Sequence, residues 1–411
     1  MHTAGRQRFR RTTREDTAMT NAVIVDAVRT AGGKRNGKLK NWHSADLASE
    51  PLKALIERND LDPGLVDDVI MGCVMQVGEQ SLNVGRSAAL AAGFPESVPA
   101  TTIDRQCGSS QQALHFGAQG VIAGAYDIVI AGGVESMTRT PMGSSVVRDL
   151  GFPFGPRVMA RYAERGGLVG QGEGAELIAD DWGITREDLD EYAVRSHQRA
   201  ATATAEGRFE REIVPVHIRN DEGADTDELI TTDEGIRPDS SVEVLGNLKP
   251  AFRQENGKVT AGNSSQITDG ASAVLIMSEE KAAQLGLTPR ARFHSFAVVG
   301  SDPIRMLTGP IPATKLVLER AKLTLDDIDL VEINEAFASV VLAWQKETGA
   351  DLGKVNVNGG AIALGHPLGA SGAKLAGTLL NELERTGGRY GLLTMCEGGG
   401  MANATILERL G

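Results

Sequence analysis

The chain has 411 residues, 41% of them hydrophobic and 23% charged, which is typical of a globular protein of two or three domains. The formal net charge of -12 argues against general affinity for nucleic acids or anionic membranes. No apolar run approaches the roughly 18 residues of a membrane span. Three cysteines without the spacing of zinc ligands argue against a disulfide framework or a metal site and favour a reducing compartment.

The N-terminal segment has an unusual composition. Residues 1–18 contain five arginines and few apolar side chains. We expect them to form a disordered extension or an incorrectly assigned start upstream of Met19. A transit peptide and an interaction arm are the alternatives, and Glu15 and Asp16 count against a transit peptide.

Strand-like and helical segments alternate after this extension. Residues 22–30 predict a buried strand, and residues 44–59 predict an amphipathic helix capped by Ser44. Further strand-like or helical segments follow at 66–77, 109–124 and 126–133. This alternation predicts an α/β fold in which helices cover a mixed or mainly parallel sheet.

A large inserted region is expected at residues 138–267. Glycine, charge and mixed polarity dominate there, and the only clear strand is REIVPVHI. A strand and a helix resume after it, so residues 19–137 and 268–290 would form one half of the fold. Residues 291–411 would form the other half.

The second half reads as a divergent copy of the first. LDPGLVDDVIMG at 61–72 aligns with LTLDDIDLVEIN at 323–334, and AYDIVIAGGVESM at 125–137 aligns with RYGLLTMCEGGGM at 389–401. Both pairs have an offset of about 260 positions. A site between two such halves would draw residues from both.

Cys107 is the first candidate for chemistry. It lies where an extended segment gives way to Gly108 and a helix, so its thiol should lie at a helix N-terminus. Backbone N–H groups and the helix dipole would lower the thiol pKa from about 8.5 and favour a reactive thiolate. The alternative is a small, inert buried cysteine.

Three candidates lie in the second half. His366, in the glycine-rich loop NGGAIALGHPLGASG, would act as a base or oxyanion donor, or as a surface turn residue. Cys396 follows the strand GLLTM and would act as a general acid or base, or be incidental to a glycine turn. Asn334 ends the corresponding earlier strand, where helix capping is its alternative role. Their places at strand ends favour one shared site.

Five stretches resemble the thiolase family, from about Ala22 to the C-terminus. They are Asp104 to Ser109, Gly132 to Met137, Asn334 to Phe337, Asn358 to Pro367, and Cys396 to Gly400. The second cysteine, in a Cys-x-Gly setting, separates this pattern from the related ketoacyl synthases. The resemblance implies a layered α-β-α-β-α core of two repeated halves, with residues 138–267 as a loop domain that binds CoA.

The resemblance also implies a role for each matched residue. Cys107 would accept the acyl group, His366 would activate it, and Cys396 would move the proton at the α-carbon of the acetyl-CoA unit. Asn334 would position a water that forms one oxyanion hole with His366, and the N–H groups of Cys107 and Gly398 would form the other. The reaction would be ping-pong thiolytic cleavage of a 3-oxoacyl-CoA by CoA, or the reverse condensation, without a permanently bound cofactor or metal.

The resemblance also implies which residues contact the substrate. Ser265 would lie near the pantetheine of CoA and Arg237 near its adenine. Gln171 stands where many short-chain members have methionine, and Gln106 precedes the nucleophile where an apolar residue is common, so both would shape the acyl pocket. These departures resemble degradative thiolases of bacterial lipid and steroid catabolism. Cys73 has no family role and is expected to be buried and inert.

Two other functions remain open from the sequence. They are a ketoacyl-synthase-like condensing enzyme and a non-catalytic subunit that binds acyl-CoA. The resemblance further implies a homodimer or homotetramer, and the chain end LERLG, which lacks a peroxisomal signal, favours the bacterial cytoplasm.

Overall fold

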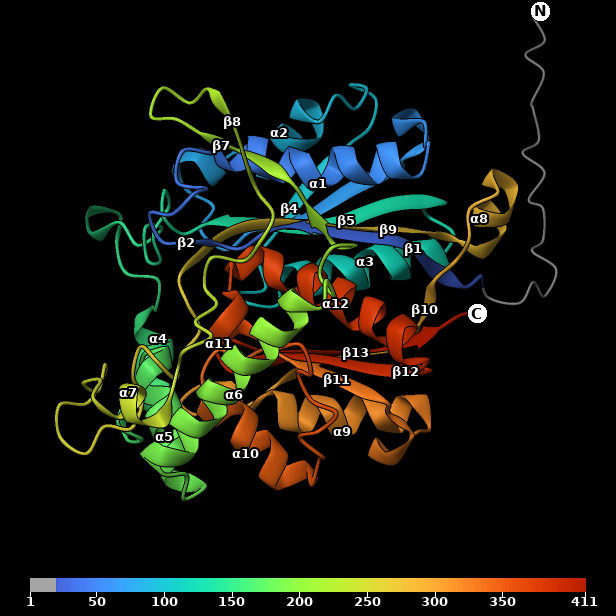
Figure 1. Cartoon of the computed structure of the whole chain (residues 1–411). Helices are drawn as coiled ribbons and strands as arrows, with labels where there is room; N and C mark the ends of the chain where they lie inside the picture. Colours follow the sequence, from blue (N-terminus) through green and yellow to red (C-terminus); the bar gives the residue numbers. More distant parts are fainter. Residues whose placement is uncertain (1–19) are drawn as a thin grey trace, which may run out of the picture.

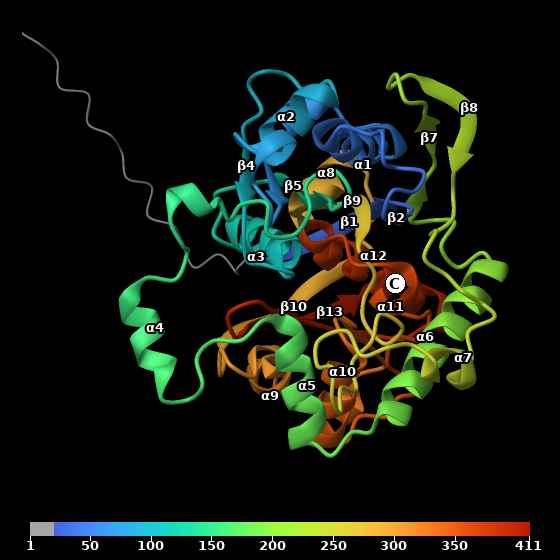
Figure 2. The ribbon, with the colours of Figure 1, turned by 90° about the vertical axis from the view of Figure 1, so that its left-hand side faces the viewer.

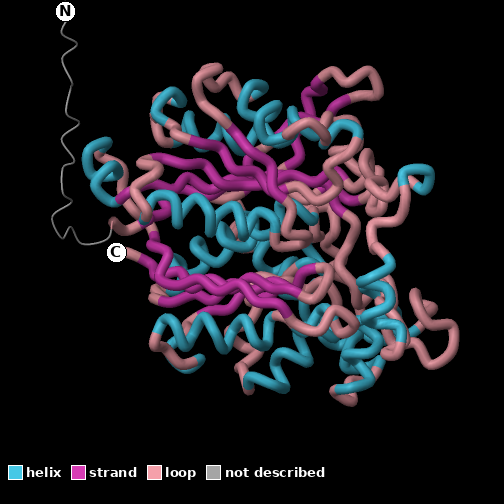
Figure 3. Tube along the Cα trace, turned by 180° about the vertical axis from the view of Figure 1, so that it is seen from behind, coloured by secondary structure: helices cyan, strands magenta, loops and turns pink. Residues whose placement is uncertain are grey.

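A computed structural model describes residues 20–411, so the extension expected at residues 1–18 lies outside the described residues. One continuous sheet of eleven strands forms two layers (Figure 1). Helices lie above, between and below these layers, as Figure 3 shows. The α-β-α-β-α architecture implied by the resemblance is therefore confirmed.

The first layer has five main strands. In spatial order they are β1 (Ala22–Thr30), β9 (Thr268–Ser278), β5 (Ile128–Ser136), β3 (Asp68–Gly72) and β4 (Ala100–Ile103). Strand β3 runs parallel to β4 and β5, while β9 runs antiparallel to β1 and β5. All eleven residues of β9 are buried, because helices cover both faces of this layer.

The second layer repeats this pairing pattern. Its strands are β10 (Ala291–Gly300), β13 (Met401–Arg409), β12 (Tyr390–Glu397) and β11 (Leu330–Ile333). Strand β11 is parallel to β12, as β3 is to β5, and β12 is antiparallel to β13, as β5 is to β9. The layers join where β1 pairs with β10 at Val23↔Arg292 and Ile24↔Ala291.

Two long helices fill the space between the layers. They are α3 (Ser109–Ile122) and α12 (Ser371–Thr386), and their apolar side chains share one core with strands of both layers. The outer faces carry α1 (Ser44–Arg58), α2 (Val84–Ala91), α9 (Pro310–Ala321) and α10 (Ala338–Thr348) (Figure 1). Two shorter helices, α8 (Glu279–Leu285) and α11 (Ala361–Leu364), complete the two halves.

The region between β5 and β9 combines helices, a hairpin and long irregular stretches, and most of it lies on the left-hand side of Figure 1. Its elements are α4 (Pro156–Ala163), α5 (Gln171–Asp181), α6 (Arg186–Ala205), α7 (Val242–Gly246), and the strands β7 (Val216–Arg219) and β8 (Asp225–Ile230). The hairpin partner β8 was not expected. Its sequence DTDELI is polar and mostly exposed, so it lacks the apolar alternation by which strands are recognised.

Two short strands attach to the first layer. Strand β2 (Gly33–Lys34) pairs with β9, and β6 (Ile213–Val214) pairs with β1. The expected Ser44 cap is wrong, because His43 is the N-cap of α1 and its Nδ1 accepts from the Ala45 N–H at 3.2 Å. Within residues 20–411, no helix has the length and apolar character needed to cross a bilayer.

Candidate active site

The turn between β4 and α3 presents Cys107. Gln106 has a left-handed backbone with φ 49°, and Gly108 is the N-cap of α3. The Ser109 hydroxyl donates to the Gln106 carbonyl at 2.6 Å and accepts from the Arg105 N–H at 2.9 Å. These contacts fix Cys107 directly before the helix, as expected, with only 4% of its surface exposed.

The electrostatic expectation for Cys107 is wrong. Burial and the neighbouring carboxylate of Glu397 raise the pKa of the Cys107 thiol to about 12 in the unliganded protein. Backbone N–H groups and a hydrogen bond from the Gln171 side chain act in the opposite direction but are weaker. Position at a helix N-terminus lowers a thiol pKa only when burial and nearby negative charge do not outweigh it.

Cys396 belongs to the second half and lies close enough to Cys107 to interact with it electrostatically. It lies near the end of β12, is fully buried, and has a pKa raised well above its usual range by burial and by the adjacent Cys107. Gly398 lies two residues after Cys396, and a Cβ atom at position 398 would lie 2.9 Å from Gln106 Oε1. All three cysteines of the chain, including the buried Cys73, are free.

His366 is held in a defined orientation by its loop. Its backbone N–H donates to the Thr268 hydroxyl at 3.1 Å, and its ring Nδ1 lies 2.5 Å from Ser371 Oγ. Because the Ser371 hydroxyl donates to the Pro367 carbonyl at 2.9 Å, it accepts from His366. We therefore assign the proton to Nδ1, which leaves the Nε2 lone pair available.

The imidazole is neutral in this environment. Burial, together with the positive charge of Lys374, lowers the pKa of His366 to about 3. Lys374 is itself buried and donates to the carbonyls of Leu364 and Gly365 at 2.9 and 3.1 Å, so it supports the loop just before His366. The pKa directions therefore favour a neutral His366 imidazole and a protonated Cys107 thiol.

Asn334 completes this side of the site. Its Nδ2 lies 3.3 Å from His366 Nε2, and its backbone N–H donates to the Thr394 carbonyl, two residues before Cys396. Among residues 20–411, no group donates to its buried Oδ1. The capping alternative is wrong, because α10 begins at Ala338 with Phe337 as its N-cap.

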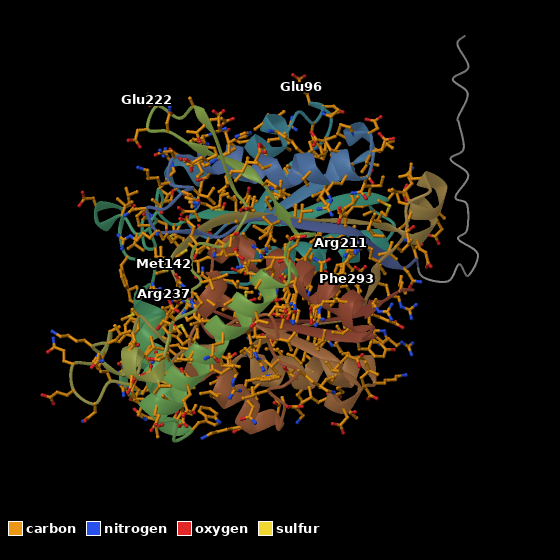
Figure 4. The ribbon with its side chains drawn as sticks, viewed as in Figure 1. Glu96, Met142, Arg211, Glu222, Arg237 and Phe293 are labelled. Carbon is orange, nitrogen blue, oxygen red and sulfur yellow. The ribbon has the colours of Figure 1, made fainter. Side chains whose placement is uncertain are left out.

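Hydrogen bonds link the segments that carry two of the residues expected to contact CoA, Ser265 and Arg237, to the site. The Ser265 N–H donates to the Ala336 carbonyl at 2.9 Å, and the next residue, Gln266, accepts from the His366 N–H at 3.3 Å. The Gln266 side chain donates to the Gly235 carbonyl at 2.8 Å, two residues before Arg237. Arg237 is exposed, and Figure 4 shows it on the same side of the molecule as Met142.

The structure also contains an apolar cavity of about 300 Å³. It is lined by Phe152, Phe154, Met159, Leu168, Val169, Gly170, Pro303, Met306 and Gly399. Two of the lining residues, Gly170 and Gly399, directly precede Gln171 and directly follow Gly398 in the sequence. Helix α4, which supplies Met159, stands away from the body of the protein (Figure 2).

Sequence reasoning missed three residues of this environment: Ser371, Lys374 and Glu397. A charged residue after the apolar strand LLTMC was a visible signal for Glu397. Ser371 and Lys374 had no comparable signal, because a serine and a lysine at the start of an amphipathic helix are ordinarily capping or exposed residues.

Family models match nearly the whole chain. The thiolase N-terminal domain matches residues 22–280, and the thiolase C-terminal domain matches residues 287–409. The chain belongs to the thiolase family. The family resemblance stated from the sequence is confirmed.

Individual thiolases are similar along their full length. A steroid 3-ketoacyl-CoA thiolase, FadA6 of Mycobacterium tuberculosis, is 51% identical and is matched over 95% of each chain. A 3-ketoacyl-CoA thiolase of Aliivibrio fischeri is 48% identical over 95% of this chain and 100% of its own. The crystal structure of Bacillus anthracis acetyl-CoA acetyltransferase superimposes with a TM-score of 0.86 at 40% identity, covering 96% of this chain and 100% of its own.

Proposed function

We propose that this thiolase cleaves 3-oxoacyl-CoA with CoA to give acetyl-CoA and a shortened acyl-CoA, through an acyl-Cys107 intermediate. The observation that carries the proposal is the meeting of two free, buried cysteines from opposite halves. Ionisation of Cys107 raises the pKa of Cys396, so the two sulfurs lie within electrostatic range. CoA enters as a substrate, and no permanently bound cofactor takes part.

The first half-reaction transfers the acyl group to sulfur. His366 Nε2 takes the thiol proton, and the Cys107 thiolate attacks the C3 carbonyl of the substrate. The C2–C3 bond then breaks, its electron pair passes into the enolate of acetyl-CoA, and Cys396 protonates that carbon. In the second half-reaction the Cys396 thiolate takes the proton of a new CoA, whose thiolate attacks acyl-Cys107. The bond between the acyl carbon and the Cys107 sulfur breaks, the shortened acyl-CoA leaves, and Cys107 recovers its proton from His366.

Two groups of donors would stabilise the oxyanions. His366 and a water held by Asn334 would form one oxyanion hole, which agrees with the unpartnered Asn334 Oδ1 and the 3.3 Å contact between these side chains. The N–H groups of Cys107 and Gly398 would form the other. Ser371 supports this assignment, because its contact with Nδ1 keeps Nε2 directed at the reacting groups.

We propose an extended or ring-bearing apolar acyl group as the preferred substrate. The cavity beside Gly399 supports this choice, since apolar residues make up most of its lining. The similarity to a steroid 3-ketoacyl-CoA thiolase adds support for a steroid side chain. Gln171, which follows the lining residue Gly170, would shape the acyl pocket, while Ser265 and Arg237 would contact CoA.

The oligomeric state and the cellular location are two further parts of the proposal. We propose a homodimer or homotetramer in the cytoplasm, on the strength of the family membership. Residues 138–267 would act as the CoA-binding loop domain, inserted between β5 and β9 of the first half. Size-exclusion chromatography with light scattering would test the oligomeric state.

Loss of 3-oxoacyl-CoA on addition of CoA tests the reaction. Acetoacetyl-CoA, a medium-chain 3-oxoacyl-CoA and a steroid side-chain 3-oxoacyl-CoA would be compared with Cys107→Ala. Cys73→Ala is the matched control, because it removes an equally buried cysteine that has no place in the mechanism. The proposal requires cleavage that disappears only in Cys107→Ala.

The assay also separates the competing functions. A ketoacyl-synthase-like enzyme would transfer acyl groups without consuming 3-oxoacyl-CoA in the presence of CoA. A non-catalytic subunit would bind CoA esters without acylation of Cys107, as seen by mass spectrometry. Either result would refute thiolytic cleavage.

A further inference from the structure

A buried carboxyl group stands beside the nucleophile without a role in the mechanism above. Glu397 is the last residue of β12, directly after Cys396, and none of its surface is exposed. Its Oε1 packs so closely on Gly108, the residue after Cys107, that any side chain at position 108 would overlap it. The lack of a side chain at Gly108 thus makes room for this carboxyl.

Glu397 has few hydrogen-bond partners. With the Asn403 amide oriented so that its oxygen accepts from the Gln112 N–H at 3.2 Å, its nitrogen donates to Glu397 Oε1 at 3.0 Å. The buried Oε2 has no partner among residues 20–411. An ionised carboxylate with one donor and no paired cation would be costly here, which favours the neutral acid.

The charged and titratable groups around Glu397 come from three elements. They are Asp104, Arg105 and Cys107 on the turn before α3, Cys396 on β12 itself, and Glu135 on β5. The negative charge of Glu135 raises the pKa of Cys107. Burial raises the pKa of the Glu397 carboxyl to about 8, which Arg105 opposes and Asp104 reinforces. In turn, negative charge on Glu397 raises the pKa of Cys107.

We propose that Glu397 tunes the nucleophile through its own protonation, because the carboxylate makes ionisation of the buried Cys107 thiol harder than the neutral carboxyl does. Glu397 acts on the reaction only through Cys107 and is therefore a positioning residue. The inference rests on the proposed function only in treating Cys107 as the nucleophile. The acid is neutral below about pH 8 and ionised above it, so Cys107 becomes harder to ionise as the pH rises through this value.

Alkylation of Cys107 tests this directly. The rate with iodoacetamide would be followed from about pH 6 to about pH 10 by mass spectrometry of the Cys107 peptide, for the native chain and Glu397→Gln, which keeps the shape and removes the charge. We expect the alkylation rate of the variant to be about tenfold higher above pH 9. Below about pH 7 the two rates should agree, because Glu397 is then neutral in both.

Glu332→Gln is the matched control. Glu332 is a buried carboxyl on the neighbouring strand β11, also with an unpartnered Oε2 and a raised pKa. Its charged neighbours are Glu335, Glu212, Glu382 and Lys374 rather than Cys107. Its loss should leave the alkylation profile unchanged.

Three results would overturn the proposal. They are an unchanged profile in Glu397→Gln, an equal acceleration at every pH, and the same shift in Glu332→Gln. If Glu397→Gln does not fold, the native chain decides the question: ionisation of Glu397 requires the rise of the alkylation rate with pH to flatten near pH 8, and a rise without such a break would refute the proposal. Alkylation with the expected profile but no thiolytic cleavage would reject the proposed function and leave this inference standing.

Discussion

Ser371→Ala tests how His366 is held. The Ser371 hydroxyl accepts from His366 Nδ1 at 2.5 Å and donates to the Pro367 carbonyl, so it selects the tautomer with a free Nε2 lone pair. Alanine removes this acceptor in a buried site, where solvent cannot replace it. Without this acceptor, the proton is no longer held on Nδ1, and the tautomer with the proton on Nε2 becomes populated.

The size of the effect follows from the hydrogen bond. A buried donor without a partner costs about 1–3 kcal/mol, which corresponds to about 5- to 160-fold in the population of the productive tautomer. Because every turnover requires Nε2 as the base, we expect kcat/KM to fall by a similar factor. Substrate KM should change much less, since Ser371 does not contact the expected CoA residues.

The assay is steady-state thiolytic cleavage, with thermal unfolding as a check of folding. Ser110→Ala is the control, because Ser110 is also buried and accepts from the Ala373 N–H at 3.0 Å in the first turn of α12. It has no contact with the imidazole. A folded Ser371→Ala variant with unchanged kcat/KM, or an equal loss in Ser110→Ala, would refute the reasoning.

Three further predictions concern the thiol, the cavity and stability. Gln171→Met removes the hydrogen bond that lowers the Cys107 pKa, so iodoacetamide alkylation at fixed pH should slow severalfold; faster alkylation would contradict this. Phe154→Ser should reduce cleavage of ring-bearing substrates about tenfold and spare acetoacetyl-CoA, whereas equal losses would reject the cavity as the acyl site. Burial lowers the pKa of His115 to about 3, below its unfolded value, so this group costs stability as the pH falls below about 6.5, by about 1.4 kcal/mol per unit. His115→Gln should remove that part of the pH dependence in urea unfolding at about pH 7 and pH 5, and an identical slope would disprove it.

The sequence by itself indicated several strands and helices of the two halves, and the relation between the halves. Buried strands such as β1 and β9 carry continuous apolar runs, and the offset of about 260 positions relates β3 to β11 and β5 to β12. Both signals are local in the chain, so hydrophobic periodicity and comparison within the sequence detect them. The exposed hairpin strand β8 lacks that signal and was missed.

The sequence also indicated the residues that would meet, because it placed Cys107, Asn334, His366 and Cys396 at strand ends or helix starts. Their protonation states depended on tertiary structure alone. Helix position predicted a lowered pKa for Cys107, but burial and Glu397, 290 positions away in the chain, raise it to about 12. Desolvation and Coulomb interactions depend on which side chains share a dry interior, and the order of residues does not contain that information until the chain has folded.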